Sequence, residues 1–166
     1  MANVDYLTFQ LFTIRKDITE GHVTGADANS AAAWKAMDDM LTFLTPAGMS
    51  SDESDTAEGS NTMAIPARQQ FIAKNIPWRS KEVSNLVRII DRDRNTTNGL
   101  GNARPGNVLR DRTRRRFAPN SRRDAPPGLP INYYDKQWFA GLEGRDKRGL
   151  KPSKEVALPT IELSSN

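Results

Sequence analysis

Residues 29–45, NSAAAWKAMDDMLTFLT, decide the fold, because they carry the clearest helical pattern in the chain. The alanine run has high helix propensity, and Asn29 or Ser30 can cap its start. Pro46 and Gly48 then end the pattern. The large apolar residues recur at helical spacing and share one face: Trp34, Met37, Leu41 and Leu44, with Met40 at its edge. Such a stripe predicts a core helix, or a helix that faces a partner.

The segment before this helix also has helical spacing. Residues 4–20 place four apolar side chains at intervals of four, three and four: Leu7, Leu11, Ile14 and Ile18. We expect a helix there, with a short strand as the alternative because Leu7, Phe9 and Leu11 alternate. Residues 22–27, which follow Gly21 and include Gly25, predict a turn.

Two further helices are predicted downstream, each behind a capping residue. Ser80 can cap a helix over residues 80–93, and Trp78 can pack back onto it. That helix carries one apolar face: Val83, Leu86, Val87 and Ile90. Asp135 can cap a short helix over residues 135–142. The sequence therefore predicts four helices separated by polar segments.

The composition limits the size of the core. Of 166 residues, 37% are hydrophobic and 7% aromatic. Low hydrophobicity combined with abundant charge is typical of partly disordered chains. Together with the four predicted helices, this composition predicts a mainly α fold, with a few short helices, long irregular or disordered segments and a small core at best. The absence of cysteine excludes disulfides and thiolate metal sites.

The order of these segments predicts six units along the chain. They are an N-terminal helical unit at 1–47, an acidic serine-rich linker at 48–63, a helical segment at 64–94, an Arg/Pro/Gly-rich irregular connector at 95–130, a short aromatic helix at 131–143 and a charged tail at 144–166. Residues 1–60 carry three basic and ten acidic side chains, whereas residues 61–166 carry twenty-one and ten. The acidic half can therefore fold back on the basic half.

The stretch RDRTRRRFAPNSRRDAPPGLP, residues 110–130, holds seven arginines and four prolines. Guanidinium groups bind phosphates in pairs, and flexible arginine-rich segments bind nucleic acid through its backbone. We predict an intracellular, nuclear protein that binds nucleic acid without sequence specificity through Arg110, Arg112, Arg114, Arg115, Arg116, Arg122 and Arg123. The alternatives are a nuclear import signal, contact with an acidic protein surface or with the chain's own acidic half, and a solvated loop without a partner.

An aromatic cluster follows the arginines: Tyr133, Tyr134, Trp138 and Phe139. We expect these side chains to anchor the segment onto the fold or onto a partner, with base stacking as the alternative. The preceding PPGLP favours extended backbone, which would present the aromatics on a stiff lead-in. This gives a second hypothesis, a protein-interaction module that uses the aromatic cluster and the face of the 29–45 helix. A third is a decayed mobile-element fragment without function.

No group of residues points to catalysis. The only histidine, His22, has no cysteine or second histidine with which to share a metal. Asp38 and Asp39 are adjacent on a helix and diverge by about 100°, so they cannot clamp one ion together. The sequence LGNARPGN at 100–107 lacks the Lys-Ser/Thr pair of a phosphate-binding loop. We therefore expect no enzyme, no cofactor, no metal and no small-molecule substrate. With no run of 18 apolar residues, we expect no membrane span.

The order of several motifs resembles a family of basidiomycete fungal proteins present in many copies, as mobile elements are. The resemblance covers roughly residues 25–160, and its most specific pieces are MSSDES at 49–54, PWRS at 77–80 and GLPINYYDKQW at 128–138. It implies a fungal intracellular protein, and a chain that is the tail of a longer ancestral product. It implies no catalytic residue, cofactor or site.

Overall fold

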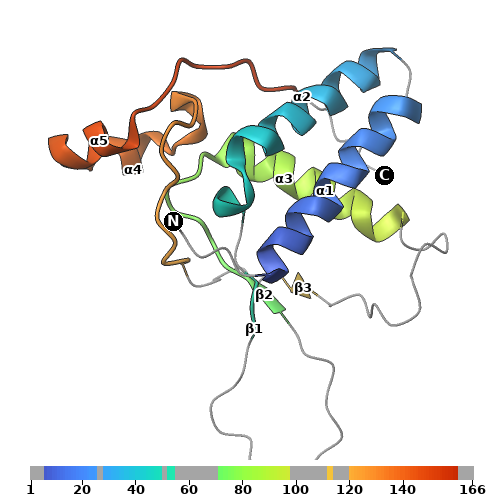
Figure 1. The fold of residues 1–166 in the computed structure, drawn as a ribbon, viewed down its shortest axis with the longest axis horizontal. Helices are drawn as coiled ribbons and strands as arrows, with labels where there is room; N and C mark the ends of the chain where they lie inside the picture. The colour runs from blue at the N-terminus through green and yellow to red at the C-terminus, as the bar shows by residue number, and fades with distance from the viewer. Residues whose placement is uncertain are drawn as a thin grey trace, which may run out of the picture.

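The part of the chain that the structure describes contains five α-helices, two short 3-10 helices and three short strands (Figure 1). The computed structural model describes residues 6–25, 28–49, 52–54, 71–97, 112–113 and 120–160. The helices are α1 Tyr6–Gly25, α2 Ala28–Leu44, α3 Lys81–Thr97, α4 Lys136–Ala140 and α5 Gly144–Leu150, and the strands are β1 Asp52–Ser54, β2 Phe71–Ala73 and β3 Arg112–Thr113. The fold is mainly helical, as the helical patterns of the sequence predict.

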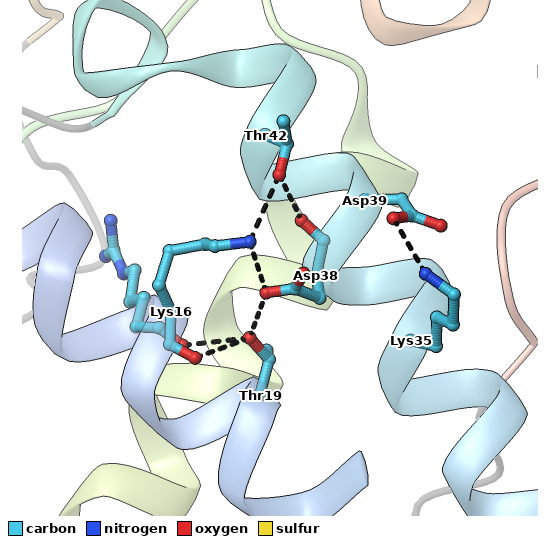
Figure 2. Close-up of polar contacts among 7 residues, drawn as sticks. Lys16, Thr19, Lys35, Asp38, Asp39 and Thr42 are labelled. Atoms are coloured by element: carbon cyan, nitrogen blue, oxygen red, sulfur yellow. Dashed lines mark hydrogen bonds and ion pairs between the residues drawn. The ribbon is translucent and has the colours of Figure 1, made fainter.

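Helices α1 and α2 pack against each other through polar side chains at one edge of their contact (Figure 2). Lys16 Nζ lies 2.5 Å from Asp38 Oδ1 and donates to Thr42 Oγ1 at 3.1 Å. Thr19 Oγ1 donates to the same Asp38 oxygen at 2.8 Å. Because the later residue of α1 meets the earlier residue of α2, the two helices are antiparallel.

Helix α3 is tied to α1 by a buried ion pair. Arg15 is fully buried, and its Nε and Nη2 donate to the two carboxylate oxygens of Asp91 at 2.7 and 2.8 Å. The remaining guanidinium nitrogen, Nη1, donates to Met49 Sδ at 3.0 Å. A buried guanidinium without a partner would strongly destabilise the fold. The bidentate pair with Asp91 compensates for the loss of solvation of Arg15. Sequence reasoning missed this pair, because Arg15 stands among polar residues of an ordinary amphipathic helix.

The hydrophobic core joins α2 and α3 to the segment before α3 and to the aromatic segment. The apolar face predicted for residues 80–93 is buried in it, and so is the face predicted for residues 29–45 except for Trp34, which is partly buried. Its fully or almost fully buried members are Met37, Met40, Leu41, Leu44, Met49, Ile76, Trp78, Val83, Leu86, Val87, Ile90, Leu129, Tyr133 and Tyr134. One cluster therefore contains side chains from the N-terminal unit, the 64–94 segment and the aromatic segment.

Both predicted caps that precede α3 and α4 are confirmed. Ser80 Oγ accepts a hydrogen bond from the Val83 amide at 3.3 Å, and Asp135 Oδ1 accepts from the amides of Gln137 and Trp138 at 3.0 and 2.9 Å. Each cap satisfies backbone donors that the first helical turn leaves without partners.

The predicted turn at residues 22–27 is wrong over its first part, because α1 continues through Gly25. The imidazole of His22 stacks on the Trp34 ring, with centroids 4.0 Å apart, and its Nε2 lies 2.6 Å from Asp93 Oδ2. These contacts to α2 and α3 offset the helix penalty of glycine, which is about 1 kcal/mol.

Helix α5 and an extended segment after it were not predicted, since the tail shows no long period. From α5 the chain returns toward α2 (Figure 1), and Val156 and Leu158 pack against the core. The side chain of Asn132 holds this return, because its Nδ2 donates to the Val156 carbonyl at 2.7 Å and its Oδ1 accepts from the Val156 amide at 3.3 Å. A single amide side chain thus pairs with the backbone as a neighbouring strand would.

The three strands were also missed by sequence reasoning. They form one sheet in the order β1-β2-β3, in which β1 and β2 are antiparallel and β2 and β3 are parallel. Each strand is two or three residues long, which is too short for an alternating pattern to be recognised.

Candidate nucleic-acid interface

The seven predicted phosphate-binding arginines fall into two groups. Arg112 begins β3, Arg122 is exposed and Arg123 is partly buried. The other four lie outside the described residues: Arg110, Arg114, Arg115 and Arg116. We call residues 104–123 the arginine-rich segment, since eight arginines stand there against the single acid Asp111.

The arginine-rich segment is attached to one short stretch of chain at two points. Upstream, Arg112 and Thr113 pair with Phe71 and Ile72 of β2 in parallel register. Downstream, Asn120 forms a parallel bridge with Asn75, and the amide of the following residue donates to the Asn75 carbonyl at 2.7 Å. Arg114, Arg115 and Arg116 therefore lie in the chain between two points fixed on residues 71–75. Within the predicted connector at 95–130, residues 112–113 and 120–121 are anchored in this way, whereas residues 95–97 belong to α3.

The anchoring stretch is itself continuous with the core. Ile76 and Trp78, directly after Asn75, are buried at 8% and 2% exposure. The next residues pair with the aromatic segment, since the Ser80 amide donates to the Tyr133 carbonyl at 2.8 Å. The Arg79 guanidinium, also buried, donates to the Gly48 carbonyl at 3.3 Å. A side chain at position 48 would be crowded, because an added Cβ on Gly48 would lie 3.1 Å from a Leu44 methyl carbon.

The aromatic cluster packs inward at its first two members. Tyr133 and Tyr134 are each 1% exposed, and the Tyr134 hydroxyl donates to the Pro126 carbonyl at 2.6 Å. Trp138 and Phe139, which are partly buried, flank the Tyr134 ring with centroids at 6.2 and 5.7 Å. The hypothesis that these aromatics contact a partner or stack on bases is therefore narrowed to Trp138 and Phe139.

Burial also shifts the ionisation of both tyrosines. It raises the pKa of Tyr133 from 10.0 to about 12, with the carboxylate of Asp39 adding in the same direction. It raises the pKa of Tyr134 as well, while a backbone hydrogen bond at Leu129 acts in the opposite direction. The neutral phenols are therefore the forms that fit the core.

The PPGLP segment, residues 126–130, contacts both the core and the chain around α5. Gly128 has a φ of 80°, which favours glycine, and its amide donates to the Leu150 carbonyl at 2.7 Å. Leu129 is buried, and its carbonyl accepts from the Ser153 amide at 2.9 Å. The segment therefore joins the core and holds the chain after α5, which the sequence did not indicate.

Three carboxylates and the histidine of the helical region form contacts between helices: Asp38, Asp91, Asp93 and His22. Asp38 turns toward α1 whereas Asp39 lies 3.3 Å from Lys35 of its own helix, so the two carboxylates diverge as predicted (Figure 2). Within the described ranges, no three histidine, aspartate or glutamate side chains are grouped closely enough to hold a metal ion. Nor is any helix in those ranges long and apolar enough to cross a membrane.

The apolar face of α2 is also occupied. Met37, Leu41 and Leu44 have no exposed surface. The hypothesis of a protein-interaction module places a partner on this same face of α2. Because the core covers these three side chains, they offer no surface to a partner. Among the large apolar side chains of α2 that the structure describes, Phe43 is the exposed one, at 46%.

Comparison with known proteins identifies a family for this chain. Residues 23–166 match the family DUF8263, which is described as a domain of unknown function. Neither a curated protein nor a solved structure matches the chain. The matched range includes α2 to α5 and all three strands, whereas α1 lies before it except for its last residues. The chain belongs to the DUF8263 family.

Proposed function

We propose that the protein binds nucleic acid through the arginine-rich segment, without sequence specificity and without catalysing a reaction. One observation carries this proposal: a stretch with eight arginines and one acid is fixed at both ends of its densest part to residues 71–75. A polyanion in the nucleus is the partner that this charge fits best. Guanidinium groups bind phosphate oxygens bidentately, which lysine cannot do.

Anchoring favours binding because it reduces the ordering that binding requires. A free arginine tether loses backbone freedom when it meets a polyanion, and this loss subtracts from the affinity. Pairing of Arg112 with Phe71 and of Asn120 with Asn75 restricts part of that freedom before the ligand arrives. Arg122, next to the second anchor, is exposed.

The placement of the arginines supports backbone contact rather than base reading. Sequence is read in the major groove by a helix or a two-stranded ribbon. The three described arginines of the segment lie outside the helices, and β3 is only two residues long. Contacts from irregular backbone to phosphates fix position but carry no sequence information.

A titration across salt tests the proposal. The full-length chain is titrated into a fluorescent 20-nucleotide single strand and into the matching duplex, from 0.05 to 0.3 M NaCl. We expect binding to both, with affinity falling linearly on a log–log plot as phosphate contacts release counterions. The triple variant R114A/R115A/R116A is expected to lower the salt slope by about 2 to 3, since each contact contributes about one unit.

A charge-matched control separates this site from net charge. The variant K35A/R88A/R92A also removes three cations, all exposed on α2 and α3. We expect it to bind within about threefold of the wild type. Affinity that does not depend on salt, or equal losses in the two triple variants, would overturn the proposal.

A further inference from the structure

Helix α5 and the residues after it carry positive charge that the fold does not use. Residues 136–155 hold six basic and three acidic side chains, whereas α1, α2 and α3 together hold seven of each. Four of the six cations are exposed and take part in none of the ion pairs of the described residues: Arg145, Arg148, Lys151 and Lys154. We call these four side chains the α5 surface.

One side of α5 faces the molecule, and the two arginines lie on another. Lys147 Nζ donates to the Ala140 carbonyl at 2.9 Å, so this side of α5 meets the end of α4. At about 100° per residue, Arg145 and Arg148 lie about 60° apart, and each is about 100° or more from Lys147. Asp146 is about 100° or more from both arginines and does not face either of them. The two guanidinium groups therefore share a side of the helix that no carboxylate of α5 neutralises.

Backbone hydrogen bonds fix the α5 surface before any ligand arrives. The Leu150 carbonyl and the Ser153 amide pair with the PPGLP segment at 2.7 and 2.9 Å. Lys151 and Lys154 each follow one of these two paired residues directly. Figure 1 shows α4 and α5 at one end of the molecule, away from α1. A fixed site at the edge of the fold loses less freedom on binding than a free chain does.

The backbone at Lys151 has a conformation that is unfavourable for lysine. This residue ends α5 with a φ of 45° and a ψ of 55°, in the left-handed region. Glycine is the usual residue at such a helix end, because a Cβ disfavours this conformation. The side chain of Lys151 is exposed and has no ion-pair partner among the described residues. A strained residue whose side chain serves no contact within the fold indicates a contact outside it.

We propose that the α5 surface is a second contact surface for the nucleic acid, which binds the phosphate backbone. This inference rests on the proposed function and adds a folded site to the arginine-rich segment. Arg145 and Arg148 bind phosphate oxygens with their planar guanidinium groups, and Lys151 and Lys154 act as point charges. Such contacts position the strand without reading its bases, and they weaken as salt rises.

Replacement of three cations of the α5 surface tests the inference. The full-length variant R145A/R148A/K154A is titrated with the fluorescent 20-nucleotide single strand, and K35A/R88A/R92A is the control with the same net charge. At 0.05 M NaCl we expect the first variant to bind about fivefold or more weakly than the control, with a salt slope lower by about 2. Far-UV circular dichroism checks that both variants keep the fold. Equal affinities and equal slopes for the two triple variants would overturn the inference.

The variant K151G separates a binding role of Lys151 from a structural one. Glycine adopts the left-handed conformation without strain, so the thermal midpoint should equal or exceed that of the wild type. The affinity for the single strand should nevertheless fall, with a salt slope lower by about 0.7 for the loss of one phosphate contact. A lower thermal midpoint together with unchanged affinity would show that Lys151 serves the fold alone, which would contradict its place in the α5 surface.

The same titrations separate failure of the inference from failure of the proposed function. Salt-dependent binding that R114A/R115A/R116A weakens and R145A/R148A/K154A does not would keep the proposed function and reject the α5 surface. Weakening by R145A/R148A/K154A alone would support the α5 surface and reject the arginine-rich segment as the binding site. Absence of binding in the wild type would reject both.

Discussion

The helical region α1–α3 and the segment 120–160 are held in place by different interactions. The helices meet through side chains at helical spacing, with the buried pair Arg15–Asp91 between α1 and α3. The segment 120–160 instead packs through extended backbone, through the Asn132 amide and through buried aromatic rings. Local periodicity organises the first region, and contacts between distant residues organise the second.

Substitution of Asp91 should lower the free energy of unfolding most, because it removes the carboxylate that pairs with the buried Arg15 between α1 and α3. Asp91→Ala leaves the fully buried Arg15 guanidinium without its carboxylate. We expect a loss of about 3 to 5 kcal/mol in the free energy of unfolding. Urea denaturation followed by circular dichroism measures it.

An exposed ion pair provides the matched control for Asp91. Lys35 and Asp39 are 66% and 55% exposed, and their double replacement by alanine should cost less than about 0.5 kcal/mol. The double variant R15M/D91L should recover much of the stability that Asp91→Ala loses, since apolar pairs replace buried ion pairs well. Equal losses in the buried and the exposed pair would contradict the structure.

Alkaline pH should destabilise the second region through Tyr133. Its pKa is raised from 10.0 to about 12, so the folded state holds the phenolic proton more tightly than the unfolded state. The contribution of the protonated Tyr133 to the free energy of unfolding is fully present below pH 10. This contribution, about 2 to 3 kcal/mol, is lost as the pH rises toward 12. Urea midpoints at pH 8 to 12 should fall less steeply in Tyr133→Phe. An unchanged steepness in that variant would show that Tyr133 is not the group responsible.

Removal of the Asn132 amide should have the smallest effect, confined to the chain after α5. Asn132→Ala deletes both hydrogen bonds to Val156 and should cost about 1 to 2 kcal/mol. Limited proteolysis with trypsin should then cut after Lys154 sooner than in the wild type. Asn85→Ala, at an exposed position of α3, is the control and should leave the cleavage rate unchanged.

The helices of the first region follow from sequence because their signals are local. The alanine run and apolar stripe of α2, the Ser80 cap of α3 and the Asp135 cap of α4 are each contained within a few residues. The end of α1 was predicted too early, since Gly25 is a local signal that the His22 contacts with Trp34 and Asp93 override. Propensity is a weak prior wherever tertiary packing opposes it.

The placement of the candidate site could be predicted only in part. The arginines themselves are evident from composition, and so is their preference for phosphate. Their attachment through Arg112 and Asn120 to residues 71–75 was not evident, because strand pairing depends on partners distant in the chain rather than on the residues alone. No short-range pattern distinguishes an anchored arginine segment from a free one.

The sequence by itself determined the mainly α class, the positions of the longer helices, the caps of α3 and α4, and the separation of charge into an acidic and a basic block. These depend on propensity, periodicity and composition, which are properties of neighbouring residues. Only the tertiary structure decided that Arg15 is buried against Asp91, that the tyrosines face inward and that β1 and β3 share β2. Each of these depends on which distant groups must be brought together to bury apolar surface and satisfy polar atoms, and no local pattern encodes that choice.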